Sequence, residues 1–118
     1  MIEIGRRVSK QPPPPHVVFE ALTQPNRDPA RPWLDLLDDE VWPRILTADE
    51  PDLVVWSSLW TKRPDALLRF ELTGGSGGTH VLWSLTVDDP EPEGRLVGHM
   101  RKRVNVLIEA GLRATFGQ

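Results

Sequence analysis

The stretch LRFELTGGSGGTHVLWSLTV, residues 68–87, decides the fold of this 118-residue chain. Apolar residues at positions 68, 70 and 72 alternate with Arg69 and Glu71, and apolar residues return at 81, 83, 85 and 87. A period of two is typical of a β-strand with one buried face. The glycine-rich segment 74–78 between the two halves predicts a hairpin connection. The stretch therefore predicts two neighbouring antiparallel strands.

Further strands are predicted on both sides of this hairpin. Upstream, LVVWSSLW (Leu53 to Trp60) reads as a strand, and EVWPRILTA (40–48) reads as a strand broken at Pro43. Short turns around Pro51 and Pro64 separate these segments, so four consecutive strands form an antiparallel meander. The first ten residues, MIEIGRRVSK, add a strand at the N-terminal end.

Helices are predicted in the remaining segments. The proline run 12–15 forms a stiff corner whose last proline starts a helix that ends near Thr23. PWLDLLDDE (32–40) is a candidate second short helix. The clearest helix runs from about Arg95 to Phe116, where apolar residues recur at helical spacing, and Gly117 is expected to end it. One sheet and one long helix must bury the helix stripe against a sheet face, which predicts an α+β fold.

Composition excludes several classes of function. The net charge is −3 and the pI is about 5.6, which argues against nucleic acid as a partner. There are no cysteines, so disulfides and thiolate metal sites are excluded. No segment approaches the roughly 20 apolar residues of a membrane span, and the N-terminus lacks a signal-peptide pattern. We expect one domain, residues 1–118, in the cytoplasm.

The segment LVVWSSLW raises the question of what its tryptophans do. In a strand, Trp56, Ser58 and Trp60 lie on one face. Three explanations remain open: the tryptophans fill a packed core, form a surface for a partner, or line a pocket for an apolar ligand. Gly111, in the middle of the long helix stripe, either leaves room for such a ligand or lets the helix approach the sheet closely.

Four segments together resemble the START-like or SRPBCC superfamily, which has the helix-grip fold. They are PPPPHVVFEALTQP, ADEPDLVVWSSLW, LRFELTGGSGGTHVLWSL and GHMRKRVNVLIEAGLRATFG. They are similar to segments of polyketide cyclase/dehydrase-like and heat-shock ATPase activator-like members. The resemblance implies a curved antiparallel β-sheet around a long C-terminal helix, with one or two short helices after the first strand. One departure is that little chain is left for the β-hairpin that members usually carry before the LVW motif.

The resemblance implies a cavity between the sheet and the long helix that binds hydrophobic or amphipathic molecules. The candidate ligand-binding residues are Trp56, Ser58, Trp60, Phe70, Trp83, Met100, Arg103, Val104 and Leu107. Arg103 has a second explanation, as a flanking residue that extends to solvent.

Catalytic and metal chemistry have little support in the sequence. The histidines His16, His80 and His99 show no metal-binding spacing, and we expect neither a metal nor another cofactor. We expect the acids 35, 38, 39 and 40 to be solvated, because they lack the spacing of a calcium loop.

Three functions follow as hypotheses. We favour a non-catalytic module that binds an apolar or aromatic small molecule. The second is an enzyme of the polyketide cyclase/dehydrase type, for which only Ser58, His99 and Arg103 offer polar groups. The third is a protein-interaction module, like the heat-shock ATPase activators, in which exposed Trp42 or Trp60 contacts a partner or a second copy.

Overall fold

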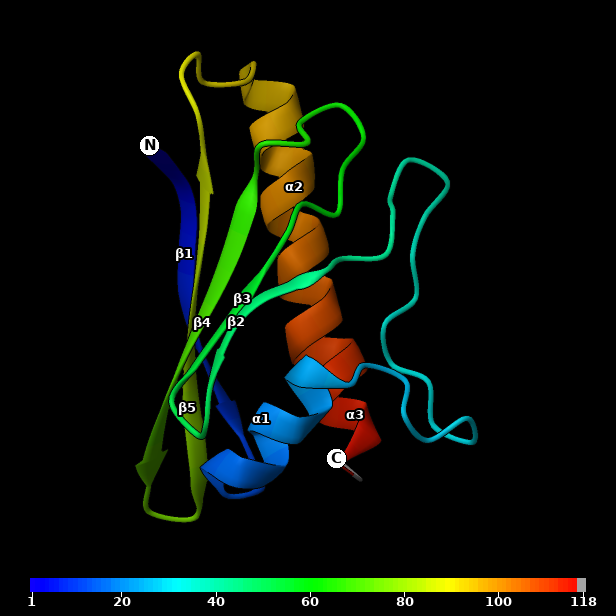
Figure 1. Ribbon diagram of the computed structural model, residues 1–118, viewed down its shortest axis with the longest axis vertical. Helices are drawn as coiled ribbons and strands as arrows, with labels where there is room; N and C mark the ends of the chain where they lie inside the picture. The colour runs from blue at the N-terminus through cyan, green and yellow to red at the C-terminus, as the bar shows by residue number, and fades with distance from the viewer. Residues whose placement is uncertain (117–118) are drawn as a thin grey trace.

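The computed structural model describes residues 1–116 and has a single antiparallel sheet of five strands (Figure 1). The strands are β1 (Ile2–Gln11), β2 (Ile45–Asp49), β3 (Leu53–Trp56), β4 (Leu67–Gly75) and β5 (Gly78–Val87). Their order across the sheet is β1-β5-β4-β3-β2. The meander predicted from the sequence is confirmed, and β1 closes the sheet beside β5.

The hairpin of β4 and β5 forms as its alternation predicts. Phe70 lies opposite Trp83, and the pairing continues to Gly75 opposite Gly78. Gly78 has a φ of 153°, and a Cβ atom there would lie 2.3 Å from the carbonyl oxygen of Gln11. Glycine is therefore required at this position, where the hairpin end meets the end of β1.

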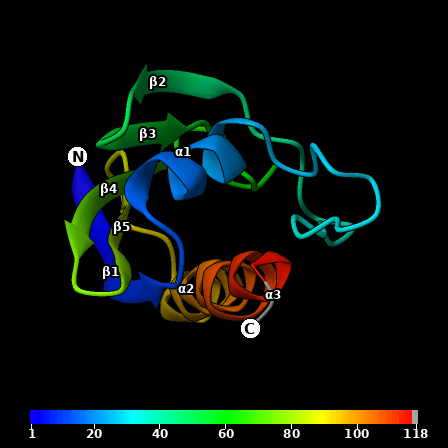
Figure 2. The same cartoon turned by 90° about the horizontal axis from the view of Figure 1, so that it is seen from below.

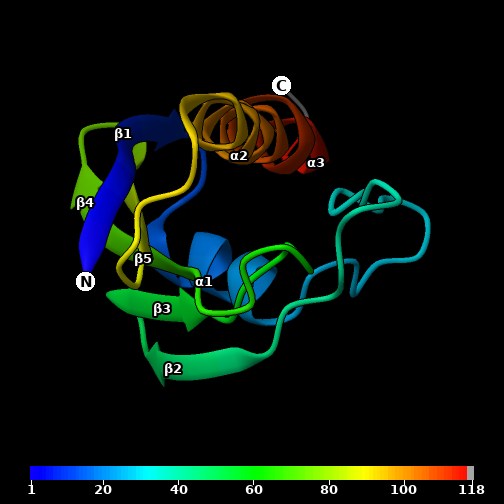
Figure 3. The same ribbon diagram turned by 90° about the horizontal axis from the view of Figure 1, so that it is seen from above.

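The helices pack on one side of the curved sheet (Figures 2 and 3). Helix α1 (Pro15–Thr23) starts at the last proline of the run and ends where the sequence predicts. The long C-terminal helix consists of α2 (Gly94–Val106), a π-helical stretch η1 (Leu107–Leu112) and α3 (Arg113–Thr115). The α+β helix-grip architecture is thus confirmed, whereas Gly117, the predicted helix end, lies outside the described residues.

Two elements differ from the prediction. The segment 32–40 forms no helix, because its backbone is held by loop contacts that include a hydrogen bond from the backbone N–H of Leu37 to the Glu40 carboxylate. Strand β3 ends at Trp56 rather than Trp60. After Trp56 the Ser57 amide still donates to the carbonyl oxygen of Arg44, and Trp60 pairs with Glu40 as an isolated bridge.

The space between sheet and helices is filled with apolar side chains. Alternate residues of β3, β4 and β5 face the helices, and the helix contributes Met100, Val104, Leu107, Ile108 and Leu112. None of the helices in residues 1–116 is both long and apolar enough to cross a membrane.

Candidate functional site

The aromatic residues predicted to bind a ligand lie in this core. Trp56 and Phe70 are fully buried, and Trp60 and Trp83 are 2% exposed. The rings of Trp56 and Phe70 meet edge to face, with centroids 4.8 Å apart. Trp56 also donates its indole N–H to the carbonyl oxygen of Leu22 at 2.8 Å. Trp60 is therefore not the exposed partner contact that one hypothesis required, while Trp42 is 53% exposed.

The other predicted ligand-binding residues occupy separate positions. Met100, Val104 and Leu107 are buried on the helix side of the core. Ser58 holds the turn after β3, because its hydroxyl accepts the amide N–H of Trp60 and donates to the carbonyl oxygen of Arg63.

Arg103 is engaged by the chain itself. Its guanidinium donates twice to the Glu40 carboxylate, at 2.8 Å in each bond, and once to the carbonyl oxygen of Asp35. The Glu40 side chain is fully buried, so the expectation that this acid is solvated was wrong. Burial by itself raises the pKa of Glu40, but the hydrogen bonds from Arg103 and from the Leu37 amide, with the charge of Arg103, outweigh it and lower the pKa.

His99 lies beside this pair and hydrogen-bonds Asp39 at 3.1 Å. Ligand atoms of Asp39, Glu40 and His99 lie within 4.8 Å of one another. Both oxygens of Glu40 already accept bonds from Arg103, so the group is explained as an ion-pair cluster that ties the loop to α2.

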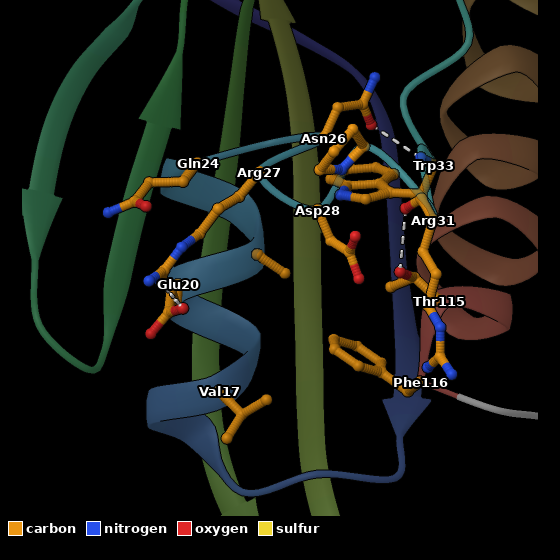
Figure 4. Close-up of a pocket in the computed structure, with 12 residues that line it drawn as sticks. Val17, Glu20, Gln24, Asn26, Arg27, Asp28, Arg31, Trp33, Thr115 and Phe116 are labelled. Atoms are coloured by element: carbon orange, nitrogen blue, oxygen red, sulfur yellow. Dashed lines mark hydrogen bonds and ion pairs between the residues drawn. The ribbon is translucent and has the colours of Figure 1, made fainter.

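An open pocket of about 520 Å³ lies between α1 and the end of the C-terminal helix (Figure 4). Its volume falls in the range of small-molecule sites, roughly 300 to 1,000 Å³. Trp33 and Phe116 project into it toward α1 from the opposite wall. The wall on α1 includes Val17 and Ala21. The polar lining residues are Glu20, Gln24, Asn26, Arg27, Asp28, Arg31 and Thr115.

Asn26 builds the wall that carries Trp33. Its side-chain oxygen accepts the amide N–H groups of Trp33 and Leu34 at 2.7 and 2.8 Å, and its amide donates to the carbonyl oxygen of Leu34. Asn26 has a φ of 60°, a left-handed conformation that asparagine tolerates better than most residues. The sequence analysis missed Asn26, although an asparagine directly after Pro25 is a local turn signal.

The same loop is fastened to the C-terminal helix. A Cβ atom at Gly111 would lie 2.7 Å from the carbonyl oxygen of Trp33, so glycine lets the loop lie directly on η1. The close approach expected at Gly111 is therefore made by this loop rather than by the sheet. Thr115 donates its hydroxyl to the carbonyl oxygen of Arg31 at 3.3 Å.

Trp33 connects the pocket to the buried aromatic residues. Its ring stacks on that of Trp56, with centroids 5.9 Å apart and planes at 27°. Trp33 is 5% exposed, and its indole N–H has no hydrogen-bond partner within residues 1–116. A buried donor without a partner is costly, so within the described chain this N–H is an unsatisfied group in a residue that lines the pocket.

Charges surround the mouth of the pocket. Arg27 pairs with Glu20 across the loop and α1, and both side chains are exposed. Asp28 accepts the amide N–H of Ala30 at 2.9 Å. Arg31 makes no ion pair with any residue that the structure describes. The pocket therefore combines aromatic surface with polar groups at its rim.

Comparison with solved structures identifies the fold. The structure resembles that of the Aha1 dimer from Colwellia psychrerythraea, with a TM-score of 0.66, 12% identity, and coverage of 92% of this chain and 91% of the other. It also resembles protein SSP2350 from Staphylococcus saprophyticus, with a TM-score of 0.72, 12% identity, and coverage of 99% and 92%. A third similar structure is the polyketide-cyclase-like protein Cgl2372 from Corynebacterium glutamicum, with a TM-score of 0.53, 11% identity, and coverage of 97% and 90%.

These proteins share the START-like, or SRPBCC, helix-grip fold, and the present chain has the same fold. At such low identities the likeness establishes the fold alone. No protein-family model and no curated protein matches the sequence.

Proposed function

We propose that this helix-grip protein binds a small apolar or aromatic molecule in the pocket between α1 and the end of the C-terminal helix. The observation that carries the proposal is the unpartnered indole N–H of Trp33 in the wall of an open pocket. The part of the Trp33 ring that lines the pocket offers apolar contact, and the N–H offers one directional bond. A ligand with an aromatic body and an acceptor atom, such as a carbonyl or ether oxygen, matches both features.

Two of the aromatic residues predicted from the sequence, Trp56 and Phe70, lie in the core behind Trp33. Trp56 backs Trp33 by stacking, and Phe70 packs against Trp56. In this arrangement the ligand rests against Trp33, whose position is fixed by the core and by Asn26. Fixed aromatic walls favour binding, because less conformational entropy is lost when the ligand arrives.

The test uses N-phenyl-1-naphthylamine, an uncharged aromatic fluorophore, as the probe. We expect its fluorescence to rise on saturable binding to the protein. Ala21→Phe fills the pocket from α1 and is expected to weaken binding at least about tenfold, since a bulky ring occupies the ligand volume. Ala110→Phe places the same ring on the exposed side of the C-terminal helix and is expected to leave binding unchanged.

A second variant tests the pocket without adding a bulky side chain that could disturb the fold. Phe116→Ala removes a pocket wall without adding bulk, and we expect it too to weaken binding. Thermal melts establish that each variant is folded. Absence of saturable binding, or equal affinity in Ala21→Phe and Ala110→Phe, would overturn the proposal. Native mass spectrometry of the protein purified from cells then identifies the natural ligand by its mass.

We infer a second candidate function, self-association through the edge strand β2. Strand β2 is at the free edge of the sheet beside β3. Large apolar side chains at and before this edge are exposed, namely Val41, Trp42, Ile45 and Leu46. Exposed apolar residues on a free edge favour a partner.

Charge favours a second copy of the chain as that partner. Arg44 directly precedes β2, whereas Asp49 is its last residue and Glu50 follows it. Antiparallel pairing of two β2 strands therefore places the basic end of each strand beside the acidic end of the other. A dimer is also described for the Aha1 structure from Colwellia psychrerythraea.

A further inference from the structure

We propose that the hollow between β1 and α2 binds the phosphate group of a small molecule. It has a volume of about 180 Å³ and lies apart from the pocket at α1. Its lining is Arg6, Arg7, Trp83, Arg101, Lys102 and Asn105. All of its charged groups are cationic, although the whole chain has a net charge of −3. The hollow is therefore expected to bind an anion.

The fold brings the cations together from two distant parts of the chain. Strand β1 lies along α2, where Gly5 allows a close approach, since a Cβ atom there would lie 3.0 Å from Cγ of Arg101. The other end of β1 is held on η1, because the side chain of Gln11 donates to the carbonyl oxygen of Ile108. The Arg6-Arg7 doublet is thereby placed beside the Arg101-Lys102 doublet.

The cations are available to an anion. Arg6 pairs with Glu3 at 3.4 Å, and both side chains are largely exposed. Arg7, Arg101 and Lys102 are exposed and have no carboxylate within ion-pair distance anywhere in residues 1–116. Guanidinium groups bind phosphate oxygens through paired N–H bonds, and an ammonium adds a third charge-assisted donor.

Two of the residues that line the hollow each have a buried polar atom without a hydrogen-bond partner in residues 1–116. Trp83 is the most buried of the lining residues, and its indole N–H lacks a hydrogen-bond partner within the described chain. The side-chain oxygen of Asn105 also lacks one there. A phosphate monoester carrying one proton has both acceptor oxygens and an O–H donor, which are the two kinds of partner that the N–H of Trp83 and the oxygen of Asn105 lack among the described residues. This pairing favours phosphate over a simple anion such as chloride.

The experiment titrates the protein with pyrophosphate at constant ionic strength, observing the indole N–H signals by NMR. We expect saturable binding and a shift of the Trp83 indole signal. The double variant Arg7→Gln/Arg101→Gln is expected to bind at least roughly tenfold more weakly, because two charge-assisted contacts are lost. The control Arg44→Gln/Arg69→Gln removes the same charge away from the hollow, in the loop before β2 and on β4, and is expected to bind as the wild type does.

A parallel arm distinguishes the source of the phosphate group. Cosedimentation with phosphatidylcholine vesicles, with and without phosphatidic acid, tests a lipid headgroup. If the protein binds pyrophosphate and the Arg7→Gln/Arg101→Gln variant binds it more weakly, the ligand is a soluble phosphate compound. If the protein binds only vesicles with phosphatidic acid, and the same variant binds them more weakly, the ligand is a lipid phosphate. No binding in either arm, or equal binding by the two double variants, overturns the proposal. Because N-phenyl-1-naphthylamine is uncharged, failure here leaves the pocket at α1 unaffected.

Discussion

At the scale of single residues, the contact between Arg103 and Glu40 joins the C-terminal helix to the loop before β2. The carboxylate is fully buried and the guanidinium is 13% exposed, so the Glu40 charge in particular has no water to replace its partner. Buried pairs contribute less than their attraction suggests, because both charges lose hydration on folding. Removing one partner is nevertheless costly, because it leaves the other charge buried and alone.

The Glu40→Gln variant is expected to lose about 3 kcal/mol of unfolding free energy at pH 7. The pKa of Glu40 is lowered in the folded protein, so its ionised form contributes stability above the unfolded pKa, near 4.3, and this contribution is lost as the pH falls through the lower folded pKa. The difference between wild type and variant should therefore shrink below about pH 4.

Urea unfolding at pH 7, 5 and 3 measures this difference. Asp39→Asn provides the control, since its partly exposed pair with His99 is expected to contribute less than about 1 kcal/mol. A loss that is equal at all three pH values would contradict the assignment of stability to the Glu40 carboxylate.

At the scale of elements, the C-terminal helix packs both against the sheet and against the loop that carries Trp33. Its stripe packs on the sheet, and its η1 stretch supports the loop that carries Trp33. A π-helical turn is uncommon and often accompanies a functional site. Here it coincides with Gly111, where the Trp33 carbonyl lies against the helix backbone.

Two glycine-to-alanine changes in this helix are expected to shift stability in opposite directions. Alanine favours helices over glycine by about 1 kcal/mol. Gly98 has open space around it, so Gly98→Ala should raise the melting temperature. At Gly111 the added Cβ would lie 2.7 Å from a backbone oxygen, so Gly111→Ala should lower the melting temperature and weaken N-phenyl-1-naphthylamine binding. A stabilising Gly111→Ala would show that the loop is not held on the helix.

At the scale of the whole molecule, the two edges of the sheet differ. The β1 edge lies against the C-terminal helix, whereas β2 remains free with exposed apolar side chains. A bulge between Ile45 and Thr47 interrupts the pairing of β2 with β3. Such irregularity limits open-ended strand addition, which favours a closed pair of two copies over a longer assembly.

Sedimentation velocity over a concentration series is expected to show a reversible dimer. Leu46→Lys places a charge on β2 and should shift the equilibrium to the monomer, because lysine on an edge strand opposes pairing. Val8→Lys puts the same side chain at the other edge, where Val8 is also exposed, and should leave the dimer intact. A wild-type protein that stays monomeric throughout would refute self-association through β2.

Local sequence patterns were enough to predict the strand order of the meander, the helix that starts at a proline and the amphipathic C-terminal helix. These elements are encoded by periodicity within short windows, and burial of one face of each then requires sheet and helix to pack together. The break of β3 at Trp56 and the loop at 32–40 were not predictable in this way, because Trp60 and Glu40 take their places through contacts with distant residues.

The candidate sites, in contrast, depend on how distant segments pack together in the folded chain. Trp33 is held in the pocket wall by Asn26, which lies 7 residues before it, and by the close approach of its carbonyl to Gly111 on the C-terminal helix. The Arg6-Arg7 and Arg101-Lys102 doublets look like ordinary solvated charges in sequence and become one cationic hollow when β1 lies along α2. Charge clusters and pockets depend on which elements are neighbours in space, and local sequence patterns do not carry that information.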